Sequence, residues 1–376
     1  MIYTKSRITF AKKRVMLFKQ KVKQEVQNLF HIQQNNRAWA IPFLAALCVG
    51  TPIIVGYLVD HLQYGVYACI SGLVIAYLPH KGSLTHRMIN VLISSFGFMF
   101  SMTIGLIFSF NPIVASLVFG LFSFAVHWVT LYYKTSPPGS FFFILIASMA
   151  ITTPFTPAEI PLRAGLIGLS TMFTCIVALS YTLFVIYKEN NKGTRQAPKM
   201  IVKNSFANSM EAIIMGVFMF LSLFIGYLLD FDKPYWISIS CSAVMLGASL
   251  YHIRQRTIHR ILGTFIGMGL SWLILSYVKS ELSICIAIIL LQFIIEVLIT
   301  RQYALAVIFI TPFTILLSEA ASPGLQDPNE LIQLRLIEIV IGSILGAIGG
   351  WFLYKEKIRY HAIRGLQKIS LSVKRK

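Results

Sequence analysis

Long apolar stretches, separated by short polar or basic turns, make up most of this chain. The longer stretches have about 20 residues, enough for a helix to cross a hydrocarbon core of about 30 Å. The pattern therefore predicts twelve membrane-spanning helices joined by short connections. Their approximate limits are 39–59, 64–79, 88–110, 112–133, 139–153, 162–187, 208–229, 235–251, 260–278, 282–300, 303–318 and 334–354.

The twelve predicted spans divide into two sets of six with matching boundaries. Three short motifs recur at offsets of 170 to 173 residues: 56–60 (GYLVD) as 226–230 (GYLLD), His86-Arg87 as His259-Arg260, and Leu162-Arg163 as Leu334-Arg335. An even number of spans per set gives both sets the same orientation, so a pseudo-twofold axis along the membrane normal would relate them. The predicted fold is an all-α polytopic membrane protein of two parallel six-helix repeats, 38–187 and 207–354.

Three further segments complete the predicted organisation. Residues 1–37 form a basic amphipathic segment, 188–206 a polar cytoplasmic linker and 355–376 a basic tail. The first segment lacks the compact apolar core of a signal peptide, and none is expected. Its apolar positions follow helical spacing, which is typical of a helix lying on anionic lipid headgroups. No base-reading module accompanies it, so we expect no nucleic-acid partner.

Composition and charge support this topology. Only 12% of the residues are charged, against roughly 25% in soluble domains. The net charge is +19, and 29 of the 33 Lys and Arg residues lie on one side if both termini are cytoplasmic. The positive-inside rule then places both termini in the cytoplasm of a multi-pass cell-membrane protein. Most of the positive charge orients the chain and requires no ligand.

Motifs for enzyme chemistry are not found in the sequence. There is no glycine-rich phosphate loop ending in Lys-Ser/Thr, and no nucleophile–base pair or metal-ligand cluster. The five cysteines lie inside predicted spans at unrelated spacings. We therefore expect no enzymatic activity, no cofactor and no metal site.

The predicted span 235–251 is short and rich in hydroxyl groups. On a helix, Ser238, Ser242 and Ser249 fall within about 40° of one another, with Tyr235 and Trp236 at the start of the span. Such a stripe suits a polar substrate pathway. Hydrogen bonding between small residues of neighbouring helices explains it equally well.

A basic turn is expected after this span. It carries Arg254, Arg256 and Arg260, and Arg87 matches Arg260 in the first half. Guanidinium groups bind carboxylates, so the turn is a candidate vestibule for organic anions. An interfacial anchor is the favoured interpretation of the first two arginines, whereas the matched pair suggests a shared structural or pore role. Helix packing is the favoured role of the small residues that follow, Gly263 and Gly267.

Ionisable residues inside spans mark functional sites by default. Glu296 lies in a long apolar run, and His127 stands at the corresponding place in the first half. An imidazole and a carboxylate of this kind are candidates for proton coupling. Alternatively, Glu296 pairs with Arg301 near the interface.

Two other sets of charged residues repeat. Arg335 and Glu338 are expected to pair along one helix, whereas Arg163 has no such partner at the corresponding position. Asp60 and Asp230 follow equivalent spans, which suggests a role at the helix end.

A longer pattern carries a family resemblance. Tyr235-Trp236, then Arg256, then His259-Arg260-x-x-Gly263-Thr264-x-x-Gly267 resembles the fusaric acid resistance-like, or aromatic acid exporter, superfamily. Its plant relatives include the aluminium-activated malate transporters. The resemblance is sharp over about 35 residues, and the first half lacks the Gly-Thr-x-x-Gly element.

The resemblance implies an inner-membrane exporter of organic, in particular aromatic, acid anions, driven by the proton-motive force. The implied partner is a small organic acid, and a homo-oligomer is compatible with the sequence. Two alternatives stay open: a passive organic-anion channel, and an envelope-associated membrane protein without transport activity.

Overall fold

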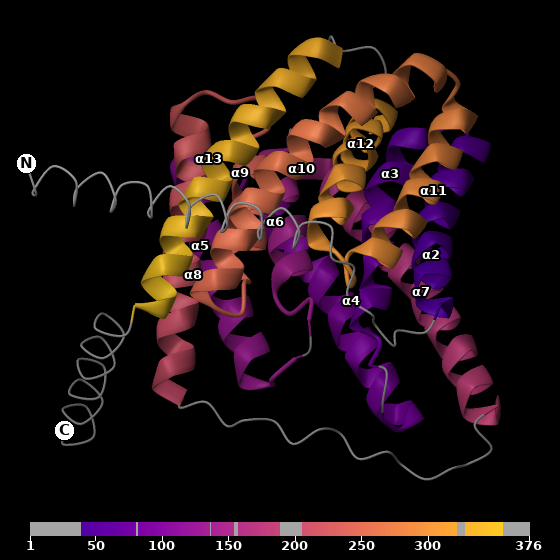
Figure 1. Cartoon of the computed structure of the whole chain (residues 1–376). Coiled ribbons are helices and arrows are strands. Elements are labelled where there is room, and N and C mark those ends of the chain that lie inside the picture. Colours follow the sequence, from indigo (N-terminus) through magenta and orange to yellow (C-terminus); the bar gives the residue numbers. More distant parts are fainter. Residues whose placement is uncertain are drawn as a thin grey trace, which may run out of the picture.

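The structure is a computed structural model that describes residues 39–79, 82–135, 137–153, 157–188, 205–321 and 328–355. Over these residues it consists of helices and connecting turns, with no strand (Figure 1). The amphipathic segment expected at 1–37, most of the linker and nearly all of the basic tail lie outside the described residues.

Each predicted span corresponds to one α-helix. The α-helices are α2 (Ala40–Leu58), α3 (Leu62–Ser71), α4 (Leu84–Ile107), α5 (Pro112–Tyr132), α6 (Phe141–Thr152), α7 (Ile160–Lys188), α8 (Ser205–Leu228), α9 (Tyr235–Met245), α10 (Leu250–Tyr277), α11 (Glu281–Leu298), α12 (Tyr303–Ala321) and α13 (Pro328–Tyr354). Two 3-10 helices, η1 (Gly72–Tyr77) and η2 (Pro157–Glu159), complete the described elements. The predicted all-α class is therefore confirmed.

Length and composition divide the helices into two kinds. Among the described residues, nine helices are long and apolar enough to cross a membrane. Three shorter apolar helices remain, Leu62–Tyr77, Phe141–Thr152 and Tyr235–Met245. The protein is thus a multi-pass membrane protein in which three helices are shorter than a straight crossing requires.

The basic segment expected as a turn is helical instead. Helix α9 ends at Met245, earlier than predicted, and the chain reverses through Gly247, where a Cβ atom would lie 2.8 Å from Ile253. Ser249 then caps α10, since its hydroxyl accepts the backbone N–H of His252 at 3.3 Å. The three arginines of the segment consequently lie in the first turns of α10, and Arg256 and Arg260, four residues apart, share one face of the helix.

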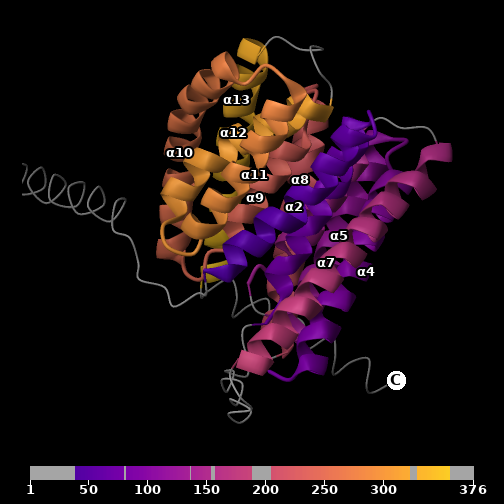
Figure 2. The same cartoon turned by 90° about the vertical axis from the view of Figure 1, so that its right-hand side faces the viewer.

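The two halves pack through corresponding helix pairs. Within the first half α4 contacts α6 and α7, and within the second half α10 contacts α12 and α13. Between the halves α5 packs on α8, α2 on α11, α6 on α9, and α3 on α12. Figure 2 shows α9 to α13 gathered beside the helices of the first half. A two-repeat arrangement requires such pairs, and the repeat itself stays a prediction.

Asp60 and Asp230 occupy equivalent turns after α2 and α8. Both have a positive φ, 57° and 54°. In each turn the next residue closes the helix end: the N–H of His61 donates to Gly56 O at 2.9 Å, and that of Phe231 donates to Gly226 O at 3.2 Å. Asp tolerates this left-handed conformation better than most residues, which explains its repetition as a helix-end residue.

Large apolar side chains cover the outward faces of the long helices. Phe96 on α4, Leu169 on α7 and Phe265 on α10 are mostly exposed, whereas Ser101, Thr174 and Ser271 of the same helices are buried. A soluble protein rarely exposes such a continuous apolar surface. These faces therefore contact lipid.

Two glycines allow α10 to approach α12 closely. A Cβ atom at Gly263 would lie 2.9 Å from Val307, and one at Gly267 would lie 2.6 Å from the Ile308 carbonyl oxygen. Gly269, two residues further on and on the opposite face of α10, has nothing within 4 Å of such an atom. The contact between the two helices thus depends on the absence of side chains at the first two positions.

Replacing Gly267 with leucine should force α10 and α12 apart and lower stability by about 1–3 kcal/mol, as overpacking does elsewhere. Gly269→Leu is the matched control, because its side chain would enter open space. Thermal unfolding of the purified variants in detergent would measure the difference. Equal midpoints for the two variants would show that this contact does not limit stability.

Candidate functional site

A large cavity lies between the two halves, with a volume of about 1830 Å³. Each of the described α-helices, α2 to α13, contributes to its lining. We call the end where α7 ends and α8 begins the linker end, and the opposite one the far end. The lining runs from Gly82 and Arg87 at the linker end to Lys233 and Arg335 at the far end. The cavity is thus a candidate pathway through the bundle.

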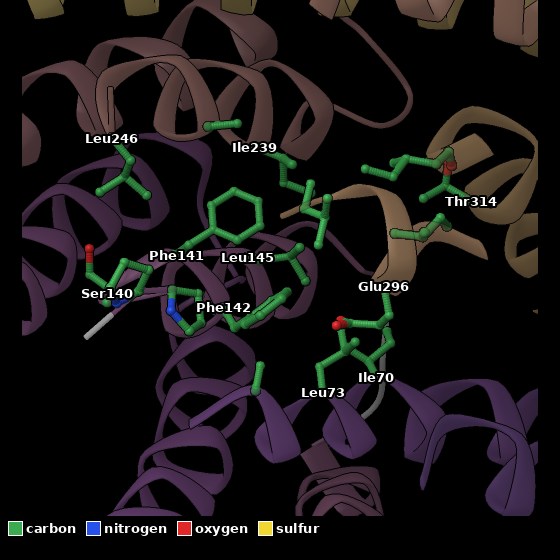
Figure 3. Close-up of a pocket in the computed structure, with 18 of the residues that line it drawn as sticks. Ile70, Leu73, Ser140, Phe141, Phe142, Leu145, Ile239, Leu246, Glu296 and Thr314 are labelled. Carbon is green, nitrogen blue, oxygen red and sulfur yellow. The ribbon is translucent and has the colours of Figure 1, made fainter. Parts of the chain in front are cut away.

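The middle of the cavity is apolar and aromatic. Figure 3 shows Phe141, Phe142 and Leu145 of α6 lying between Ile239 of α9 and Ile70 of α3. The side chains come from both halves, so the apolar section forms at their interface. It suits a ligand with an apolar body.

Three arginines expected at the site line the cavity: Arg87, Arg256 and Arg260. Arg256 donates from Nη1 to the Ala243 carbonyl oxygen at 2.9 Å, and its guanidinium lies 5.2 Å from the centre of the Tyr303 ring. Arg260 donates from Nη1 to the Tyr303 hydroxyl at 3.4 Å. Tyr303, which the sequence analysis did not single out, contacts two of the three arginines.

Arg254 does not belong to this group. Its side chain is exposed and is not part of the cavity lining. It lies six residues before Arg260, so it occupies another face of α10. This placement matches an anchor at the membrane surface.

The predicted serine stripe does not line the cavity. Ser238 and Ser242 are fully buried, and neither is a lining residue. The hydroxyl of Ser222 on α8 donates to that of Ser238 at 2.9 Å, and the Ser242 hydroxyl donates to the Ile239 carbonyl oxygen at 3.0 Å. Ser249 lies beyond the end of α9, as the cap of α10. The expected stripe is therefore corrected: its hydroxyls bond within and between helices.

The opposite face of α9 does line the cavity. Tyr235, Trp236, Ile239 and Ala243 are lining residues at helical spacing. The first two were expected at the site, but the pathway was expected on the serine face of the helix, which is the wrong one. A 3.6-residue period identifies faces without showing which neighbour each one meets.

The candidate proton carriers His127 and Glu296 both line the cavity and are both buried. His127 nevertheless contacts a different carboxylate: its Nε2 lies 3.9 Å from Oε1 of Glu211 on α8. Its Nδ1 lies 2.8 Å from the Ser140 hydroxyl. The sequence did not indicate Glu211, because it lies near the start of a span, where charged residues are common.

The alternative partner of Glu296 has a contact of its own. Arg301 stacks on Trp39, with its guanidinium 4.7 Å from the ring centre. Figure 3 shows Glu296 beside Ile70 and Leu73, at the cavity. Proton coupling through Glu296 and His127 stays a prediction.

Arg335 faces the far end of the cavity. Its guanidinium lies 3.7 Å from the centre of the Trp236 ring and donates from Nη2 to the Thr314 hydroxyl. The expected ion pair with Glu338 is wrong, since among the described residues no carboxylate oxygen lies within 4.0 Å of a side-chain nitrogen of Arg335. Helical spacing brings two residues to one face, but the stacking on Trp236 directs the arginine elsewhere.

Arg163, expected to lack a partner, has one. Glu159 accepts from its Nη2 at 2.7 Å and from its Nε at 3.0 Å, and its guanidinium stacks on Tyr67 at 4.8 Å. The carboxylate lies four residues before the arginine, whereas the expectation considered only the position three residues after it.

Lys233 adds a second positive charge at the far end. It lies in the turn between α8 and α9, half-buried, and donates from Nζ to the Ser318 hydroxyl at 2.6 Å. Burial lowers the pKa of Lys233 below that of an ordinary lysine, and the positive charge of Arg335 acts in the same direction. The lysine therefore loses its charge at lower pH than a solvated one.

Comparison with known proteins covers part of the chain. Residues 221–349 match the family described as fusaric acid resistance protein-like. The chain is 33% identical over 146 residues to an uncharacterized membrane protein, YvaC, of Bacillus subtilis (strain 168). This alignment covers 39% of the chain and 23% of that relative, so the chain spans about a quarter of its length. No solved structure matches the chain.

The matched segment contains α9 to α12 and most of α13, and with them Trp236, Arg260 and Arg335. The distant similarity to the plant malate transporters stays a prediction. The chain is a multi-pass membrane protein whose residues 221–349 match the fusaric acid resistance protein-like family.

Proposed function

We propose that this chain is a transporter of the cell membrane, with both termini in the cytoplasm, that exports organic and in particular aromatic acid anions. The observation that carries this proposal is the cavity between the halves, with an apolar, aromatic middle and cationic side chains towards both ends. The matched family supports it, because its description names resistance to an aromatic acid.

The charge balance of the cavity favours anions. Five basic residues line it (Arg87, Lys233, Arg256, Arg260 and Arg335), against three acidic ones (Glu211, Asp232 and Glu296). Positive charges that face a cavity surrounded by hydrocarbon act strongly on an entering ion, because little water screens them. The excess of cations therefore selects anions over cations of the same size.

The dimensions of the cavity fit a pathway better than a closed binding pocket. Its volume, about 1830 Å³, exceeds the roughly 300–1,000 Å³ of a typical small-molecule site. A monovalent anion that leaves the cytoplasm gains about 2.3 kcal/mol per 100 mV of inside-negative potential. Movement of the anion out of the cytoplasm is thus energetically favourable.

Coupling to protons has candidate carriers at the linker end. His127, Glu211 and Glu296 line the cavity there, and the first two contact each other across the α5–α8 interface between the halves. A proton exchanged at this interface would change the attraction between the halves. We therefore favour proton-motive-force driven export.

A passive organic-anion channel is the second candidate. It is favoured by the extent of the cavity lining, which includes residues at both ends of the bundle. In a coupled exporter a proton gradient alone drives accumulation of the organic anion, whereas in a channel it does not.

Single cysteines in a variant without the native cysteines should distinguish the two faces of α9. Ala243→Cys should react with a small water-soluble thiol reagent, because Ala243 lines the cavity, whereas Ser242→Cys should not react. Mass spectrometry would measure the labelled fraction of each variant, and the two neighbouring positions are compared. Equal labelling would contradict the assignment of the cavity face.

Substitution of Arg260 should impair transport far more than substitution of Arg254. Loss of one charge-assisted hydrogen bond costs about 1.5–3 kcal/mol, so Arg260→Gln should weaken the apparent affinity for the anion by about tenfold or more. Arg254→Gln is the matched control on the same helix, outside the cavity. Uptake of labelled benzoate into proteoliposomes measures the apparent affinity of each variant. Unchanged affinity in a folded Arg260→Gln variant would exclude this arginine from the pathway.

A pH gradient imposed at zero membrane potential should drive accumulation of the anion against its own gradient. Glu211→Gln and Glu296→Gln should each abolish this accumulation but leave downhill flux intact, because the carboxylate is needed only for the proton. Glu281→Gln, at the exposed start of α11, is the control.

Three outcomes of this measurement separate the hypotheses. Accumulation that depends on the pH gradient supports the coupled exporter. Flux that only equilibrates the anion indicates the channel. No flux of any organic acid in correctly inserted protein would leave a membrane protein without transport activity.

A further inference from the structure

Two buried arginines face the cavity from different helices of the second half. Arg260 on α10 and Arg335 on α13 are only 6% exposed, and both are lining residues. Among the residues that the structure describes, neither forms an ion pair within 4.0 Å. A buried cation without a counter-ion is costly in the low-dielectric interior of a membrane protein.

Their hydrogen-bonding capacity is also largely unused. Arg335 donates to the Thr314 hydroxyl, and Arg260 reaches the Tyr303 hydroxyl only at 3.4 Å. The Nε atom of each is buried without an acceptor in the described part of the chain. Since guanidinium groups have several N–H donors and no acceptor, both side chains retain donors for a ligand.

The two positive charges also act on each other. Arg260 is close enough to Arg335 for their charges to interact, and Lys233 adds a third positive charge beside Arg335. Glu338 and Asp232 lie nearby, yet neither comes within ion-pair distance of the arginine. Repulsion between the cations would be relieved by an anion between them.

The corresponding arginine of the first half has a carboxylate partner, in contrast to Arg335. Arg163 lies at the place that matches Arg335 and also stacks on an aromatic ring, that of Tyr67. It differs in having a carboxylate partner, Glu159 of η2, one oxygen of which accepts from both Nε and Nη2, and it does not line the large cavity. Position 331, four residues before Arg335, holds leucine. The second half thus keeps the arginine but has no carboxylate four residues before it.

Aromatic rings lie next to the unused donors. The guanidinium of Arg335 stacks 3.7 Å from the centre of the Trp236 ring, and the Tyr235 and Trp236 rings are 4.8 Å apart. Both residues line the cavity. A planar ring attached to a carboxylate would find apolar surface there.

We propose that Arg260 and Arg335 together bind the carboxylate of an aromatic acid, whose ring rests on Tyr235 and Trp236. This site deepens the proposed function and rests on it. Arg335 is thereby a substrate-binding residue, and the carboxylate takes the place that Glu159 occupies beside Arg163.

Calorimetric titration of the purified full-length protein in nanodiscs tests the site, with benzoate as the probe. Benzoate should bind, and benzamide, which has the same ring without the charge, should not. Cyclohexanecarboxylate should bind more weakly, because its ring is not planar. Arg335→Gln and Arg260→Gln should each reduce the affinity for benzoate by about tenfold or more. Their effects should not add, since both act on one carboxylate.

Arg163→Gln is the matched control and should leave the affinity for benzoate unchanged. If Arg335→Gln fails to fold, Arg335→Lys serves instead, because it keeps the charge but loses the planar fork and the stacking on Trp236. A folded Arg335 variant that binds benzoate like the wild type overturns the proposal. A purely structural arginine would lower the midpoint of thermal unfolding and leave the affinity intact.

Measuring both benzoate binding and flux distinguishes a failure of the binding site from a failure of the transport function. Arginine-dependent binding without flux in proteoliposomes would support the site and refute the exporter. Flux that persists with unchanged affinity in both arginine variants would support transport and overturn the site.

Discussion

Charged groups buried in a membrane bundle require partners, and this requirement organises the interior of the protein. Three cations inside the described helices have recognisable partners: Glu159 for Arg163, the Tyr303 ring for Arg256 and the Trp236 ring for Arg335. Rings and hydroxyls compensate a charge less completely than a carboxylate does. The arginines that have only such partners face the cavity. The positive charges that remain available to a ligand therefore lie at the cavity.

Close helix packing decides which side chains reach that cavity. Helix α9 is pressed against α13, where a Cβ atom at Gly342 would lie 2.3 Å from the Ile237 carbonyl oxygen and one at Gly346 would lie 2.7 Å from that of Cys241. Glycines on one helix thus fix the face of α9 that is buried against protein. The remaining face, with Tyr235 and Trp236, is left for the cavity. The three short helices all contribute to the lining, so the pathway is built where the bundle departs from full-length spans.

The sequence allowed the helices to be predicted because their determinants are local. Apolar length sets each span, and the repeated Asp60 and Asp230 mark helix ends whose backbone conformation few residues accept. The contacts of the site are long-range and could not be derived in this way. Glu211 meets His127 from 84 positions away along the chain, and the identity of that partner depends on how α5 packs on α8. Arg335 was assigned to Glu338 because helical spacing allows the pair, whereas the ring of Trp236 competes for it from another helix.

The two halves show how one arrangement supports two roles. Arg163 and Arg335 hold matching positions and both stack on an aromatic residue of a short helix, Tyr67 and Trp236. The glutamate four residues before Arg163 neutralises one arginine, whereas no carboxylate of the described residues forms an ion pair with the other. Selection for stability alone would favour the neutralised form in both halves, because an uncompensated buried charge is destabilising. The family match covers the half in which the charge is retained, and that half also contains the second arginine, Arg260. The cost of keeping both charges is accounted for if an anion binds between them during transport.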